Sequence, residues 1–277
     1  MKEPKVIECD STPGLPVLVM ISGLSIDHSW LEDCSSQLIA LRPRVARIAL
    51  FSLPGHGGAP PLAGSHDEGC VAHSVRDRLE RLVPGGAERQ LILLGYSAGA
   101  LVACKFACLF PDRVEALCLI AAGGLAPGLT QRFISRLAKS RCGSCALPAF
   151  FTLGKKGAAA GPGGNASAPL STTDPATATR LCRDLSYYTR ECGELYRAAA
   201  ALGKPTLLVS GGRDVGENPR QKGHELLKQI FASSDELYLP DATHFVAVEE
   251  AAAIARALVT FTSFLRPEGG LRLARML

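Results

Sequence analysis

Short apolar runs alternate with longer amphipathic stretches along most of this chain. A short apolar run bounded by turn residues is typical of a strand that is buried on both faces. Such runs predict strands over residues 5–9, 16–21, 44–51, 90–95, 114–121, 205–210 and 235–239. Helical spacing of apolar positions predicts helices over residues 28–41, 70–83, 98–109, 218–231 and 249–265. Because strands and helices alternate, we predict an α/β fold with a mostly parallel central sheet and helices on both faces.

The alternation stops between residues 123 and 203, where two helical patterns flank a glycine-rich stretch, residues 154–169. That stretch has no periodicity and cannot bury enough apolar surface to offset the entropy lost on ordering, so we expect a flexible loop. We therefore predict a core formed by residues 1–122 and 204–277. Residues 123–203 are predicted to be a helical cap, or lid, inserted into this core.

A Gly-x-Ser-x-Gly pentad follows the strand predicted over 90–95, with Gly95, Ser97 and Gly99 at its fixed positions. A helical pattern begins directly after it, which is the strand–turn–helix context of a nucleophile elbow. Glycines at 95 and 99 let the strand and the helix approach closely. We predict that Ser97 is a catalytic nucleophile at the positive end of the following helix. The alternative is an ordinary turn serine.

A serine nucleophile needs an imidazole to accept its proton and a carboxylate to orient that imidazole. In this arrangement the acid and then the histidine follow the serine along the chain. Two histidines, His224 and His244, come after Ser97. His244 follows a predicted strand, at the end where active sites of open α/β sheets gather, whereas His224 falls within a polar-faced helix. We predict that His244 is the base.

The predicted acid is Asp214, which follows the strand over 205–210 and precedes His244 by one helix and one strand. This spacing allows both side chains to come from adjacent loops at one edge of the sheet. Glu217 is the competing carboxylate, and a turn or helix-cap role is the alternative for Asp214. The oxyanion donors are predicted to be the backbone N–H groups of Ala98 and Leu24.

With these residues placed, the chain resembles the α/β-hydrolase superfamily over nearly its whole length. The resemblance rests on four ordered segments: Ser22-Gly23-Leu24 with Trp30, Ser52-Leu53-Pro54-Gly55-His56-Gly57, Phe110-Pro111-Asp112-Arg113-Val114, and His244-Phe245 with Glu249. Ser22, Ser52 and Thr243 stand where the superfamily usually has His, Asp and Gly. The usual His and Asp side chains tie loops together, so we expect Ser22 and Ser52 to lose those ties. His56 is interpreted as a structural turn residue.

The resemblance and the candidate triad together imply a serine hydrolase of a small-molecule ester or thioester, acting through an acyl-enzyme without cofactor or metal. A carbon–carbon bond hydrolase of the same fold is an alternative, but that subfamily typically carries Asn where this chain has Tyr96. Dehalogenases and epoxide hydrolases of this fold use an Asp nucleophile, so Ser97 argues against these two classes of enzyme. A small-molecule receptor that keeps the triad is the alternative from another class.

Composition narrows the functional classes. Apolar residues make up 47% of the 277 residues, the net charge is only +4, and the basic residues are scattered, so we expect no nucleic-acid partner. The sequence has no long apolar run, so we expect no integral membrane span. It also lacks an N-terminal apolar region, so we expect no signal peptide and a cytoplasmic location. The ten cysteines are then expected to be reduced thiols. Cys142 and Cys145 have the spacing of a metal or redox pair, but no nearby second pair completes a zinc motif.

Overall fold

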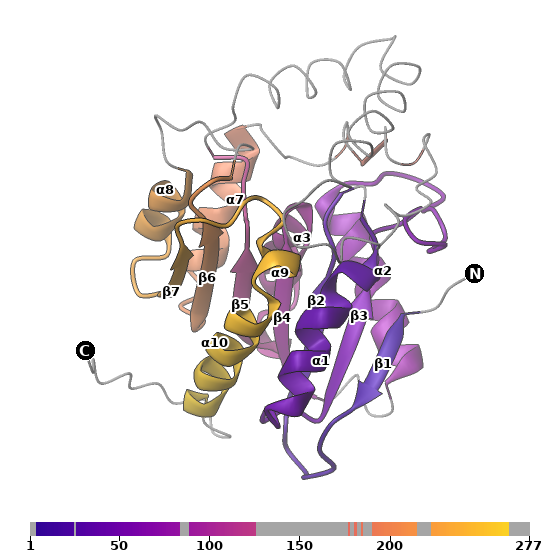
Figure 1. Ribbon diagram of the computed structural model, residues 1–277. Coiled ribbons are helices and arrows are strands. Elements are labelled where there is room, and N and C mark those ends of the chain that lie inside the picture. Colours follow the sequence, from indigo (N-terminus) through magenta and orange to yellow (C-terminus); the bar gives the residue numbers. More distant parts are fainter. Residues whose placement is uncertain are drawn as a thin grey trace.

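The computed structural model describes residues 4–24, 26–83, 89–125, 190–214 and 223–265, together with 177, 180, 181 and 184. Within these residues, seven strands form one sheet between two layers of helices (Figure 1). The strands are β1 Lys5–Glu8, β2 Val17–Ile21, β3 Arg47–Phe51, β4 Leu91–Tyr96, β5 Val114–Ile120, β6 Thr206–Gly211 and β7 Asp235–Leu239. Their order in the sheet is β1-β3-β2-β4-β5-β6-β7.

The sheet is mostly parallel, as predicted, and has the α/β-hydrolase arrangement. Among the described strands, only β1 pairs antiparallel with its neighbour, in the register Lys5 to Leu50, and the others pair in parallel. Strands β2 and β4 at the centre of the sheet are buried along their whole length. Because the sheet is parallel, the carboxyl ends of β2, β4, β6 and β7 lie at one edge, and the loops that follow them meet there.

Helices cover both faces of the sheet. They are η1 His28–Leu31, α1 Glu32–Ala40, α2 Glu68–Leu82, α3 Ala98–Leu109, η2 Pro111–Arg113, α7 Arg190–Ala200, α8 Gly223–Ile230, α9 Val246–Glu249 and α10 Ala251–Phe264. Helices α1 and α10 pack on one face, in front of the strands in Figure 1, and α2, α3 and α7 pack on the other. Alternation along β2 supplies both cores, with Val17 and Val19 on one side and Leu18 and Met20 on the other.

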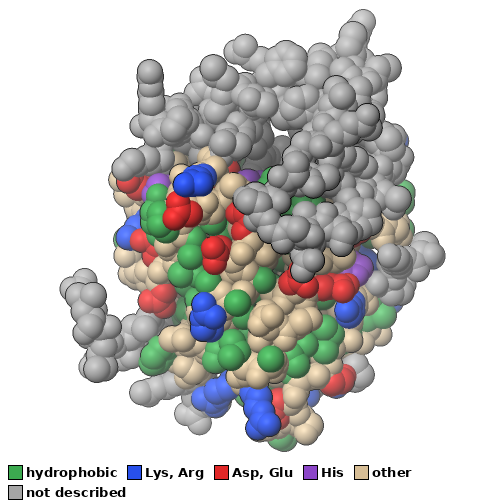
Figure 2. All heavy atoms as spheres, viewed as in Figure 1, with side chains coloured by type: hydrophobic (Ala, Val, Ile, Leu, Met, Phe, Trp, Pro, Cys, Tyr) green, Lys and Arg blue, Asp and Glu red, His purple; other side chains and the backbone are tan. Residues whose placement is uncertain are grey.

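On the face that α1 and α10 cover, positive and negative side chains are interspersed rather than gathered by sign (Figure 2). Mixed charges of this kind are typical of a solvated helical surface. In the described part of the chain, no helix combines the length and the apolar character needed to cross a bilayer.

Two predicted helices begin differently from their patterns. The helix predicted over 28–41 starts as the 3-10 turn η1, because the Asp27 side chain accepts from Ser29 N and caps it. The helix predicted over 249–265 is preceded by the single turn α9 and interrupted at Glu250, whose φ of −125° is not helical. Both helices still bury apolar side chains, with Leu38 in α1 and Ile254 and Leu258 in α10.

The predicted cap is only partly covered by the described residues. Helix α7 belongs to it, and α7 packs against α3, with Tyr196 and Cys192 in the core of that face. The glycine-rich stretch 154–169 and most of the remaining cap lie outside the described residues, as do Cys142 and Cys145. The division into core and cap therefore stays a prediction.

Candidate active site

Ser97 occupies the sharp turn that joins β4 to α3. Its φ of 54° and ψ of −118° lie in a backbone region that residues other than glycine rarely adopt. Holding a residue there costs about 1–3 kcal/mol. The turn is held from the neighbouring strand, because Ser97 N donates a 2.9 Å hydrogen bond to the carbonyl of Ile120, the last residue of β5. The surrounding sheet therefore imposes the strained conformation.

The two glycines of the pentad are required by backbone contacts. A β-carbon on Gly95 would lie 2.4 Å from the carbonyl oxygen of Gly99, and one on Gly99 would lie 2.4 Å from that of Ile21. Real β-carbons essentially never come so close to a carbonyl oxygen. The strand and helix therefore approach each other as the sequence predicts, and α3 also lies directly against the end of β2.

The structure brings the three predicted triad residues together from three different strand ends. Ser97 Oγ lies 2.9 Å from His244 Nε2, and His244 Nδ1 lies 2.7 Å from Asp214 Oδ2. Ser97 is 7% exposed, while the Asp214 and His244 side chains are 10% and 28% exposed. Ser97 and the carboxylate are therefore both largely shielded from water, and the imidazole between them is the most exposed of the three groups.

The loop that carries Asp214 is fastened to the loop that carries His244. Gly212 N donates to Leu239 O at 2.8 Å, and Arg213 N donates to Ala242 O at 2.9 Å. A β-carbon on Gly211 would lie 2.5 Å from the Ala242 carbonyl oxygen, so only glycine allows the two loops to approach this closely. The distance between acid and imidazole is thus fixed by backbone contacts as well as by the hydrogen bond between the two side chains.

Of the two other candidates considered for these roles, only His224 can be placed in the structure. Glu217 lies outside the described residues. His224, on α8, stacks on the ring of Tyr238 with 5.0 Å between centroids, and Tyr238 is 43% exposed. This agrees with the interpretation of His224 as a residue of a solvated helix.

Two features of the His244 loop were not expected from the sequence. The hydroxyl of Tyr96 donates a 2.7 Å hydrogen bond to the carbonyl oxygen of His244. Thr243, at the position where glycine is usual, donates to the Glu249 carboxylate from both its N–H and its hydroxyl, each at 2.7 Å. A buried tyrosine hydroxyl needs a hydrogen-bond partner, so the sequence could indicate that Tyr96 has one. The sequence does not indicate which atom that partner is.

The backbone positions predicted to bind an oxyanion flank Ser97. A β-carbon on Gly23 would lie 2.9 Å from Ser97 Cβ, so the loop after β2 lies against the elbow, and Leu24 is its next residue. Ala98 is the first residue of α3, and the first N–H groups of a helix have no partner within the helix. Both N–H groups thus belong to backbone that adjoins Ser97.

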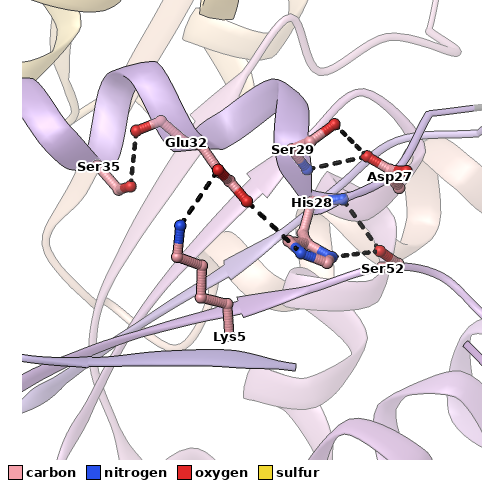
Figure 3. A network of polar contacts seen from close by, with 7 residues as sticks. All are labelled: Lys5, Asp27, His28, Ser29, Glu32, Ser35 and Ser52. Carbon is pink, nitrogen blue, oxygen red and sulfur yellow. Dashed lines mark hydrogen bonds and ion pairs between the residues drawn. The ribbon is translucent and has the colours of Figure 1, made fainter. Parts of the chain in front are cut away.

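The loop ties that Ser22 and Ser52 were expected to lose are made by other atoms. Ser22 Oγ donates to the Ile26 carbonyl at 3.2 Å. Ser52 Oγ accepts from His28 N at 3.0 Å and lies 3.0 Å from His28 Nδ1, which joins the loops after β2 and β3 (Figure 3). The expected loss is therefore wrong for Ser52, because His28 supplies a donor that the serine accepts, whereas the Ser22 bond lies within its own loop.

The same network reaches the edge of the sheet. Glu32 Oε1 lies 3.7 Å from His28 Nε2, and its other oxygen lies 3.1 Å from the Lys5 ammonium on β1 (Figure 3). His56 is buried in the neighbouring turn, where its Nδ1 lies 2.9 Å from the Pro54 carbonyl. This agrees with a structural role for His56.

The described cysteines are free thiols, and burial keeps several of them protonated. It raises the pKa of Cys34 to about 12 and the pKa values of Cys104 and Cys118 well above the usual range. A neutral thiol is a poor nucleophile and a poor metal ligand. In the described ranges, no cluster of His, Cys, Asp and Glu is arranged to hold a metal ion.

Comparison with protein families matches residues 18–257 to the family described as "Alpha/beta hydrolase family". The acetyltransferase component of the acetoin cleaving system of Pseudomonas putida is 27% identical over 270 residues, covering 90% of this chain and 63% of that protein. The pimeloyl-[acyl-carrier protein] methyl ester esterase of Neisseria meningitidis is 32% identical over 102 residues, or 37% of this chain and 35% of that protein. The chain thus spans less than two thirds of the length of these curated relatives.

Solved structures with the same fold include several enzymes. MenH from Staphylococcus aureus superimposes with a TM-score of 0.72 at 15% identity, covering 95% of this chain and 98% of MenH. The esterase EaEST from Exiguobacterium antarcticum gives a TM-score of 0.71 at 17% identity, with 94% of each chain covered. At this level of identity the likeness concerns the fold.

Proposed function

We propose, from the premise that this chain belongs to the alpha/beta hydrolase family, that it is a serine hydrolase acting on a carboxylic ester or thioester. Ser97 is the nucleophile, His244 the base and Asp214 the orienting acid. The observation that carries the proposal is the unbroken chain of contacts from Ser97 Oγ to His244 Nε2 at 2.9 Å and from His244 Nδ1 to Asp214 Oδ2 at 2.7 Å. This is the geometry that activates a serine hydroxyl.

Acylation begins with His244 neutral and its proton on Nδ1. The Nδ1–H group donates a hydrogen bond to the Asp214 carboxylate. Nε2 is then free to accept the Ser97 proton as Oγ attacks the acyl carbon. The buried carboxylate stabilises the imidazolium that forms. The imidazolium returns this proton to the departing alcohol or thiol, the bond between acyl carbon and leaving group breaks, and the acyl group remains on Ser97 as an ester.

The negative charge that develops on the acyl oxygen is bound by the N–H groups of Leu24 and Ala98. Each group belongs to backbone that adjoins Ser97, and donors positioned before the reaction stabilise the developing charge without reorganisation. Ala98 also lies at the positive end of α3. In the second half of the reaction, His244 removes a proton from a water molecule, which attacks the acyl carbon. The bond between the acyl carbon and Ser97 Oγ then breaks, the imidazolium returns the proton to Oγ, and the acid is released.

Ester or thioester cleavage fits the relatives better than the alternatives do. The names of one curated relative and several structural neighbours include esterase or thioesterase. A carbon–carbon bond hydrolase would use the same triad, but no feature of the described residues favours it. A receptor that keeps the triad would differ from an enzyme in hydrolysing its ligand slowly.

The test combines a fluorophosphonate probe with turnover of p-nitrophenyl acetate. The wild type should be labelled at Ser97 alone and should hydrolyse the ester. Ser97→Ala should lose both properties, whereas Ser263→Ala, an exposed serine on α10 whose hydroxyl only caps a local carbonyl, should keep both. Labelling of another residue, or undiminished turnover in Ser97→Ala, would overturn the triad. Labelling with negligible turnover of esters and thioesters of several chain lengths would favour the receptor.

A further inference from the structure

Tyr96 couples the strand that carries the nucleophile to the loop that carries the base. It is the last residue of β4, it is 1% exposed, and its hydroxyl donates to the His244 carbonyl oxygen at 2.7 Å. A buried phenol must find an acceptor. In this chain the acceptor is the backbone of the proposed base, 148 residues away in sequence.

The tyrosine ring also lies beside the imidazole. The ring centroids of Tyr96 and His244 are 5.8 Å apart, with 34° between the ring planes. Tyr96 packs in the same hydrophobic core as Val246 and Ala247, the first two residues of α9. A single rigid strand end therefore places both Ser97 and a support for His244.

A second restraint holds the other end of the same loop. Thr243 N and Oγ1 donate to the Glu249 carboxylate, which anchors Thr243, the residue before His244. Tyr96 fixes the carbonyl that follows the His244 α-carbon. The two restraints act on opposite sides of one residue, so losing the Tyr96 hydroxyl would release one side while Glu249 still holds the loop in place.

We propose that Tyr96 is a positioning residue for His244. The Tyr96 hydroxyl holds the His244 backbone so that His244 Nε2 stays at hydrogen-bonding distance from Ser97 Oγ. The inference rests on the proposed function of the triad. Ring packing alone would be served equally by phenylalanine. What the hydroxyl adds is a fixed backbone position for the base, and small displacements of a reacting group have large effects on rate. Substrate binding does not use this bond, so the effect belongs to kcat.

The test is Tyr96→Phe, with Tyr196→Phe as the matched control. Tyr196 is also fully buried, and its hydroxyl also donates to a backbone carbonyl, that of Gly123, at 3.0 Å. Both variants lose one buried phenol donor and keep the ring. We expect Tyr96→Phe to lower kcat and the rate of fluorophosphonate labelling by roughly 10- to 100-fold, with KM within about twofold, while Tyr196→Phe keeps kcat.

A second variant keeps the inference falsifiable if phenylalanine at position 96 disturbs folding. p-Aminophenylalanine at that position retains a donor, and it should restore most of the wild-type kcat. Equal kcat in Tyr96→Phe, Tyr196→Phe and the wild type would overturn the role of Tyr96, as would a p-aminophenylalanine variant that folds but stays slow. The failure of the triad itself would look different, because Ser97→Ala would then keep its labelling and turnover.

Discussion

A β-carbon added to Gly23 would lie 2.9 Å from the β-carbon of Ser97 and 3.1 Å from the carbonyl oxygen of Tyr96. The loop that follows β2 is thus pressed against the nucleophile elbow, and its next residue, Leu24, carries one of the two proposed oxyanion donors. Only a residue without a side chain lets this loop approach so closely. The contact links the amino-terminal third of the chain to the reaction centre.

The first prediction concerns that contact. Gly23→Ala should lower kcat by about 100-fold, because the loop must retreat from Ser97 and a single oxyanion donor typically contributes 10²–10³. Steady-state turnover of p-nitrophenyl acetate measures it. Gly64→Ala is the control, since its added β-carbon meets nothing within 4 Å. If both variants keep wild-type kcat, the loop after β2 supplies no donor.

The second prediction concerns backbone strain at the elbow. Ser97→Ala and Ser97→Gly both lose the hydrogen bond to His244, but only glycine adopts φ of 54° without cost. After allowing for the greater flexibility of glycine in the unfolded chain, Ser97→Gly should be about 1 kcal/mol more stable than Ser97→Ala. Urea unfolding of the two inactive variants compares them directly. A less stable glycine variant would mean that the turn is not strained.

The strands, and the meeting of Ser97, His244 and Asp214, could be predicted because both depend on short sequence patterns. Each central strand is an apolar run between turn residues, and a parallel sheet gathers the loops after its strands at one edge. Asp214 and His244 each come directly after such a strand, so their meeting at 2.7 Å follows from topology once the strands are placed.

The supporting contacts could not be predicted, because they depend on where a side chain ends in space. Nothing in the sequence near Tyr96 indicates that its hydroxyl reaches the His244 carbonyl. The same holds for Ser52, where the usual Asp is absent but His28, 24 residues away, restores the tie between loops. The break at Glu250 is equally hidden, because the apolar pattern continues across it.

The third prediction concerns the buried thiols. Burial raises the pKa of Cys34 to about 12, so at pH 8 almost none of it is the reactive thiolate. Iodoacetamide at that pH should modify the exposed Cys70 well before Cys34 or Cys104, although burial and Asp67 raise the pKa of Cys70 as well. Peptide mass spectrometry with and without urea gives the order. Equally fast modification of Cys34 in the folded protein would contradict the burial.

The fourth prediction concerns pH and activity. A protonated imidazole cannot accept the Ser97 proton, so kcat/KM should be low in acid. It should then rise as that imidazole loses its proton and level off at higher pH. Ester hydrolysis followed from pH 5 to pH 8 provides the profile. A flat profile over that range would show that acylation does not depend on a titrating histidine.

The last prediction assigns the acid. Asp214→Asn removes the negative charge that stabilises the imidazolium, and the amide can donate to Nδ1, which favours the tautomer with its proton on Nε2. That tautomer cannot accept from Ser97, so kcat should fall by about 10²–10⁴-fold. The fold should survive, because backbone bonds from Gly212 and Arg213 still hold the loop to its neighbour. Circular dichroism and turnover, measured together, separate the loss of activity from a loss of fold.

Glu217→Gln is the matched control for this prediction. It carries the same change from carboxylate to amide three residues later in the chain, and it should remain active. If Glu217→Gln is the crippling change and Asp214→Asn is mild, the 2.7 Å contact between Asp214 and His244 orients nothing that the reaction needs.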